Sequence, residues 1–203
     1  MASALQIITP DTVRQIRRVQ ALTVGWMIIE TALSLLAAWR AHSPALVAFG
    51  GDSAIELLSA TVVLWRFRSG TAQPNAERRA ARLAGSLLFA LALYVVALSA
   101  TSLLGYSQPQ PSLLGIATLA AAALIMPRLA KEKRRLSAIA RSETLNADAT
   151  QSAVCAYLSV IALAGLAINA IWRLTWPDPL AALALVPFII WEGWETVRRK
   201  TCC

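Results

Sequence analysis

The fold of this chain is decided by long apolar stretches, of which the most informative is Pro44-Ala-Leu-Val-Ala-Phe-Gly-Gly-Asp-Ser-Ala-Ile-Glu-Leu-Leu-Ser-Ala-Thr-Val-Val-Leu-Trp65. It has the length and composition of a membrane span, for which about 20 mainly apolar residues are needed. It also contains Asp52 and Glu56, and a charged side chain near the bilayer centre costs about 2.5–3.5 kcal/mol on insertion scales. Two ionisable groups in such a stretch therefore predict a functional site within it.

The overall composition places the whole chain in a membrane. Apolar residues make up 57% of the 203 residues, whereas about 45–50% is usual in a soluble domain. Six mainly apolar runs approach the length that crosses a hydrocarbon core of ~30 Å. Two of them are short, the fourth and the sixth, so we expect their helices to extend beyond the apolar residues. The runs are residues 21–39, 44–65, 83–104, 112–126, 149–172 and 180–194.

The basic residues predict how these spans are oriented, because Lys and Arg concentrate in the short cytoplasmic connections of membrane proteins. Seventeen of the nineteen Lys and Arg residues lie in four segments: before the first run, between the second and third runs, between the fourth and fifth runs, and after the last run. The two exceptions are Arg40 and Arg173. We therefore predict an all-α integral membrane protein with six transmembrane helices and both termini in the cytoplasm.

The same alternation explains the formal net charge of +8 without a nucleic-acid partner, because the basic residues do not form one patch. The first twenty residues contain three arginines and no early apolar core, so no cleavable secretory signal is expected. We expect residues 1–203 to form a single transmembrane domain in a lipid bilayer, with no separate soluble domain.

Asp52 and Glu56 lie one helical turn apart, so their side chains share a face with ~6 Å of rise between them. Together they can hold one cation. The preceding Gly50-Gly51 allows a neighbouring helix to approach closely. The structural alternative is that one carboxyl is protonated and the other pairs with an arginine. We favour an ion site, because such a pair is rarely kept in a membrane for packing alone.

A second polar stripe opens the fifth run, where Asp148, Gln151 and Cys155 follow helical spacing. Cys155 lies deepest in the span and Asp148 lies nearest the cytoplasm. A thiolate combined with carboxylates suits zinc, cadmium or cobalt. A lone cysteine in a span is usually a small buried residue, but opposite Asp52 and Glu56 a metal ligand is favoured.

Other acidic residues occur in the first and last runs. The sequence leaves three roles open for Glu30, at mid-depth of the first run: metal ligand, proton-exchanging group, or hydrogen-bond partner of Ser or Thr on a neighbouring helix. Glu192 and Glu195 lie near the cytoplasmic end of the last run, and we expect them to pair with Arg198 or Arg199.

These motifs resemble the cation diffusion facilitator (cation efflux) family of divalent-metal efflux transporters. In that family a six-helix membrane domain combines an Asp-x-x-x-Asp pair on the second helix with a His/Asp-x-x-x-Asp pair on the fifth. Asp52-Ser-Ala-Ile-Glu56 is similar to the first pair. Ala147-Asp-Ala-Thr-Gln-Ser-Ala-Val-Cys155 is similar to the second, with Gln151 and Cys155 at the ligand positions. Trp176-Pro-Asp-Pro-Leu-Ala-Ala-Leu183 is similar to the start of the family's sixth helix.

The resemblance covers about residues 26–198 and departs from the family pattern in two respects. Gln151 and Cys155 make the site less anionic, and the family's usual cytoplasmic domain after the sixth helix is not seen in the sequence. Short relatives of this kind occur in bacteria. The resemblance thus implies a short form without the C-terminal cytoplasmic domain, a homodimer, and a bacterial inner (plasma) membrane.

We predict a transporter that exports zinc, cobalt or cadmium by alternating access in exchange for protons. It has no catalytic residues and no cofactor, because the divalent metal ion is the transported substrate. The predicted metal ligands are Asp52, Glu56, Cys155 and Gln151, with Asp148 and Glu30 as secondary candidates.

Two alternatives stay open at this point. A proton-coupled transporter of organic cations uses an intramembrane carboxylate pair equally well, and a membrane scaffold can bind metal without transporting it. An enzyme is not expected, because no partner nucleophile accompanies the two carboxylates.

Overall fold

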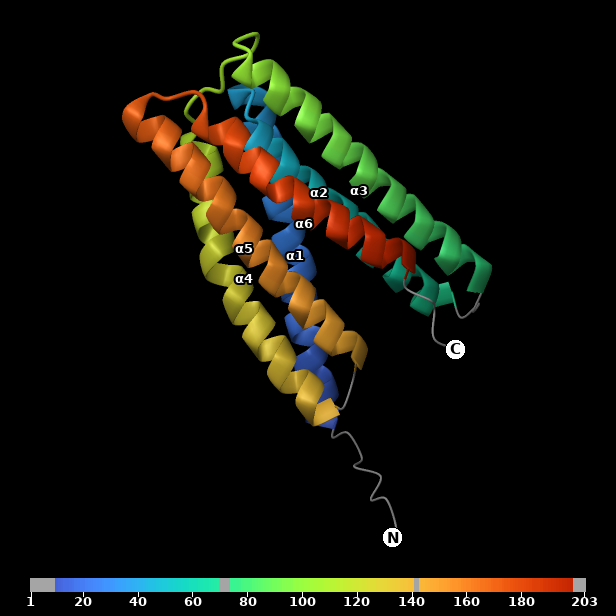
Figure 1. Cartoon of the computed structure of the whole chain (residues 1–203). Helices are drawn as coiled ribbons and strands as arrows, with labels where there is room; N and C mark the ends of the chain where they lie inside the picture. The colour runs from blue at the N-terminus through green and yellow to red at the C-terminus, as the bar shows by residue number, and fades with distance from the viewer. Residues whose placement is uncertain (1–9, 70–73, 141–142, 199–203) are drawn as a thin grey trace.

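The computed structural model describes residues 10–69, 74–140 and 143–198, and within them every regular element is a helix. The all-α prediction is therefore confirmed for this part of the chain (Figure 1). In chain order the helices are α1 (Pro10–Ala41), α2 (Pro44–Ser69), α3 (Pro74–Leu103), α4 (Leu113–Ala140), α5 (Glu143–Trp172) and α6 (Pro177–Arg198).

Five of these helices contain stretches long and apolar enough to cross a membrane, namely α1, α3, α4, α5 and α6. The expected extension of the two short runs is confirmed, because α4 has 28 residues and α6 has 22. At 1.5 Å per residue, the 26 residues of α2 span about 39 Å, which exceeds the ~30 Å hydrocarbon core. A sixth span in α2 and the orientation of the termini stay predictions.

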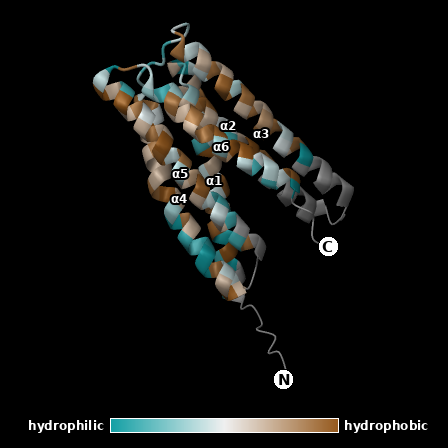
Figure 2. Cartoon of the chain, in the orientation of Figure 1, coloured by the Kyte–Doolittle hydropathy of each residue, from teal (hydrophilic) through white to brown (hydrophobic). Residues whose placement is uncertain are grey.

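The helices pack in two sets. α4 packs along α5 and contacts α1, whereas α3 packs along α6 and contacts α2. The sets meet where α1 packs against α2 and α5 packs against α6. They separate toward the end of the molecule where α1 begins and α6 ends, while the connections after α1, α3 and α5 gather at the other end (Figure 1). Hydrophilic residues gather at the first of these ends in α1, α4 and α5 (Figure 2).

The starts of α2 and α6 are joined by a buried carboxylate. Ser43 caps α2, because its Oγ accepts a hydrogen bond from the Leu46 N–H at 3.2 Å. Pro44 suits the first helical position, where its missing N–H is not needed. Asp178, buried in the first turn of α6, accepts hydrogen bonds from the Ser43 hydroxyl (2.5 Å) and the Ala45 N–H (3.1 Å). The two helices are thus fixed to each other at the end that carries the connections.

A glycine allows α5 and α6 to pack closely. A Cβ atom on Gly165 of α5 would lie 2.5 Å from the Cβ of Ala181 and 3.0 Å from the carbonyl oxygen of Pro177, both on α6. These atoms can move away only if the α6 backbone moves too. Gly25 of α1 is different, because a Cβ there meets nothing within 4 Å.

The substitution Gly165→Ala should therefore lower the free energy of unfolding by about 1–3 kcal/mol through overpacking. Gly25→Ala should leave it unchanged or raise it by up to about 1 kcal/mol, because alanine favours helix. Thermal unfolding in detergent, followed by circular dichroism, measures both. Equal changes in the two variants would contradict the close contact between α5 and α6.

Candidate functional site

Three carboxylates from two helices converge where the helix sets meet. Asp52 and Glu56 belong to α2 and Glu192 belongs to α6, and one oxygen atom of each lies within 4.8 Å of the other two. Asp52 is 2% exposed and Glu192 is 9% exposed, while Glu56 is half-buried. In the described part of the chain, no other set of three Asp, Glu, Cys or His side chains brings ligand atoms this close.

Gln151 joins α5 to these carboxylates. Its side-chain amide donates hydrogen bonds to Glu56 Oε1 at 2.9 Å and to Glu192 Oε1. An amide NH₂ group has two protons, so this group bridges one carboxylate on α2 and one on α6. The structure thus brings together three of the predicted ligands, Asp52, Glu56 and Gln151.

One atom of the cluster is left without compensation inside the protein. Among the described residues, no donor reaches Oδ1 of Asp52, which is fully buried. A buried acceptor without a partner costs about 1–3 kcal/mol, and more when it is charged. The cluster therefore needs a proton or a cation that the polypeptide does not supply.

Cys155 lies beside Glu30 and is not part of the three-carboxylate cluster. Its thiol donates to Glu30 Oε1 at 3.5 Å, and the Ser53 hydroxyl donates to the same oxygen at 2.9 Å. The Trp26 indole N–H donates to Glu30 Oε2. Of the roles that the sequence left open for Glu30, the structure shows the hydrogen bond to a serine on a neighbouring helix.

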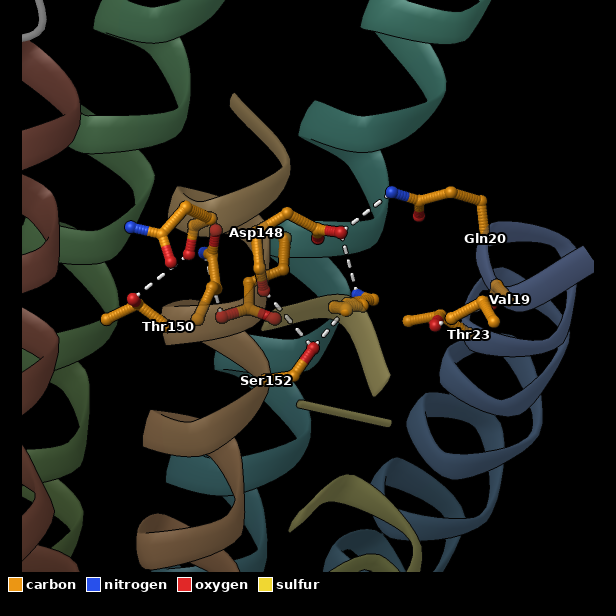
Figure 3. Close-up of polar contacts among 10 residues, drawn as sticks. Val19, Gln20, Thr23, Asp148, Thr150 and Ser152 are labelled. Carbon is orange, nitrogen blue, oxygen red and sulfur yellow. Dashed lines mark hydrogen bonds and ion pairs between the residues drawn. The ribbon is translucent and has the colours of Figure 1, made fainter. Parts of the chain in front are cut away.

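Asp148 lies in a separate network around a buried lysine. The side chain of Lys133 on α4 is 0% exposed, and its Nζ lies 2.8 Å from Asp148 Oδ2 and donates to Ser152 Oγ at 2.9 Å. Gln20 of α1 donates to the same Asp148 oxygen at 2.8 Å, and the Gln20, Asp148 and Ser152 side chains are shown together in Figure 3. This network joins α1, α4 and α5, and Asp148 is not part of the three-carboxylate cluster.

Glu192 is the member of the cluster that the sequence argument missed. Its closeness to Arg198 in the sequence suggested a pairing at the helix end, but its carboxylate accepts the hydrogen bond from Gln151. The guanidinium of Arg198 lies over the ring of Trp194, 4.6 Å from its centre. A usable signal was present, because Glu192 interrupts an apolar run in the same way as Asp52 and Glu56.

Long apolar helices around a buried acidic cluster define an integral membrane protein with an internal polar site. Residues 21–201 match the family model of the cation efflux transmembrane domain, and the chain belongs to this family. The resemblance drawn from the motifs is thereby confirmed. Members of the family are transporters and not enzymes, as predicted. Family membership and the five apolar helices also agree with the prediction of a multi-pass membrane protein.

A curated relative gives a second comparison. The chain is 22% identical over 189 residues to the manganese efflux system protein MneS of Bacillus subtilis (strain 168). The match covers 89% of this chain and 65% of MneS. The chain thus spans a little less than two thirds of the length of this relative.

The buried ion pair yields a prediction about stability. Asp148→Asn leaves a fully buried ammonium without its counter-ion, whereas Lys133→Met leaves a carboxylate that is 38% exposed and still reaches water. We expect Asp148→Asn to lower the free energy of unfolding by about 3–5 kcal/mol, and Lys133→Met to lower it less. Denaturation of both variants in detergent tests the order, and a larger loss for Lys133→Met would show that Asp148 is not needed to compensate Lys133.

Proposed function

We propose that the chain exports a divalent metal ion from the cytoplasm in exchange for protons. Family membership supports cation efflux, and the name of MneS supports a metal ion as the cargo. The observation that carries the proposal is the convergence of Asp52, Glu56 and Glu192 within 4.8 Å, with one Asp52 oxygen that no described donor reaches.

The geometry of the cluster favours a metal ion over an organic cation. Oxygen ligands on opposite sides of a divalent ion at about 2.4 Å lie about 4.8 Å apart, which is the limit within which the three oxygens already fall. A monovalent organic cation needs one carboxylate, whereas a double positive charge makes use of several. The side chains thus need little rearrangement to surround one metal ion.

The same oxygens can exchange metal for protons. Carboxylates bind a metal ion only when deprotonated, so metal binding and proton release are linked. The cluster carboxylates belong to α2 and α6, in one helix set, whereas Gln151 belongs to α5, in the other. A movement of one set against the other would open the cluster to each side of the membrane in turn, which is the requirement of alternating access.

The finer features that we propose follow from the sequence. They are six spans including α2, cytoplasmic termini, a single transmembrane domain over residues 1–203, a bacterial inner membrane and a homodimer. The sequence motifs favoured zinc, cobalt or cadmium, and the name of MneS adds manganese to these candidates. All four metals therefore belong in the assay.

Metal uptake by proteoliposomes with an acidic lumen tests this function. Protons leaving the lumen should drive at least one of the four metals inward through the unmodified protein, and a protonophore should abolish the uptake. Asp52→Asn and Glu56→Gln keep the side-chain volume and remove a negative charge. We expect each to reduce the flux by about 10–100-fold or more.

Glu195→Gln is the matched control, because Glu195 is an exposed carboxylate on α6 outside the cluster, and its flux should equal that of the unmodified protein. Full flux in Asp52→Asn and Glu56→Gln would exclude this site. If reconstituted, folded protein moved none of the four metals, efflux itself would be refuted.

A further inference from the structure

The negative charge of the cluster does not come from α5, where the sequence placed two ligands. Gln151 is neutral, and Cys155 contacts Glu30. We infer that Glu192 of α6 supplies the third anionic ligand, that Cys155 supplies none, and that the site takes a divalent cation that prefers oxygen to sulfur. This inference rests on the proposed function and names the substrate class of the same site.

Glu192 satisfies the geometric requirements of a ligand. It is 9% exposed, and one of its oxygens lies within 4.8 Å of oxygens of both Asp52 and Glu56. Its hydrogen bond from Gln151, which also bonds to Glu56, holds the carboxylate on the inner face of α6. A third carboxylate at this position makes the cluster formally −3 when fully deprotonated, which suits a divalent ion.

A second observation points to a ligand independently of the acidic residues being close together. Asp52 is 2% exposed, and its Oδ1 has no donor among the described residues. Each oxygen of the nearby Glu30 carboxylate, by contrast, has at least one donor. The protein thus satisfies the buried carboxylate of Glu30 on the neighbouring helix α1 and leaves Asp52 Oδ1 to be satisfied by something else.

The thiol of Cys155 is held away from this role. It donates to Glu30 Oε1 at 3.5 Å, and Glu30 is 0% exposed. If the thiol turned to the cluster, a fully buried carboxylate would lose a donor, at a cost in free energy. The thiol of Cys155 therefore donates to Glu30. The ligand atoms that face one another in the three-carboxylate cluster are all oxygens.

Gln151 fits the same class of ligand. Its NH₂ group lies between two carboxylates, where its protons take the place of a cation. A half-turn of the amide exchanges the NH₂ group for the carbonyl oxygen, which can then bind a metal ion. Carboxylate and carbonyl oxygens are the ligands that suit manganese, magnesium and calcium, whereas thiolates select softer ions.

Metal binding to the purified protein in detergent tests the inference. All variants carry Cys202→Ser and Cys203→Ser, which remove the only thiols besides Cys155. Titration with Mn²⁺ and with Cd²⁺ should show that Glu192→Gln weakens Mn²⁺ binding at least about tenfold. Cys155→Ser should leave the affinity for both ions within about twofold. Unchanged metal-free melting and gel-filtration profiles show that each variant is folded.

A gain of soft-metal preference provides the sharper test. Glu192→Cys places a thiolate in the cluster and should shift the ratio of Cd²⁺ to Mn²⁺ affinity at least about tenfold toward Cd²⁺. Glu195→Cys, on the exposed face of the same helix, should leave that ratio unchanged.

The measurements distinguish a failure of this ligand assignment from a failure of the proposed function. Mn²⁺ binding that survives Glu192→Gln intact, or Cd²⁺ and Mn²⁺ binding that is lost in Cys155→Ser, would overturn the assignment of the ligands and leave metal efflux standing. The absence of any divalent-ion binding by the folded parent protein would overturn the proposed function together with its ligands.

Discussion

The cost of holding carboxylates inside a membrane governs this structure. Two buried carboxylates of the described residues are compensated by groups of the chain itself: Glu30 by Trp26, Ser53 and Cys155, and Asp178 by a hydroxyl and a backbone N–H. Asp52 keeps a buried oxygen that no described donor reaches, and it lies beside two further carboxylates. Since such a cluster is expensive in hydrocarbon, its compensation must come from a mobile proton or cation. The proposed efflux would make use of this need, because its cargo is a cation that binds and then leaves.

The features that the sequence predicted well are local ones. A helix has a fixed rise and turn, so apolar length alone located the helices, and the spacing of Asp52 and Glu56 placed both on one face of α2. The ends of α4 were less predictable, because basic residues such as Lys133 were assigned to a cytoplasmic connection. In the structure α4 continues through them to Ala140, and Lys133 becomes a buried partner of Asp148.

The features that the sequence missed depend on how each helix is rotated about its axis. In a soluble protein the apolar stripe marks the inward face, but a membrane helix is apolar toward lipid and toward its neighbours alike. The sequence was therefore compatible with two arrangements of Glu192, a pairing with Arg198 or a position facing the cluster. It was likewise compatible with Cys155 in the cluster or in contact with Glu30. Only the packing of α5 and α6 against α2 and α1 distinguishes these arrangements.

The hydrogen bonds of Asp178 with Ser43 and Ala45 form a joint between the starts of α2 and α6. This joint limits how the carboxylates of the cluster can move. Asp178 holds the first turn of α2, and both helices run from this joint toward the carboxylates, which lie about 17 Å along α2 at Glu56 and about 21 Å along α6 at Glu192. With the two helices fixed at one end, movements of the cluster amount to pivoting about that end. Gln151 bonds to both carboxylates from α5, which lies in the other helix set. Its two hydrogen bonds are therefore among the contacts that a separation of the sets must break, together with the Ser53–Glu30 hydrogen bond between α2 and α1. A metal ion that replaces the amide protons would weaken this part of the link.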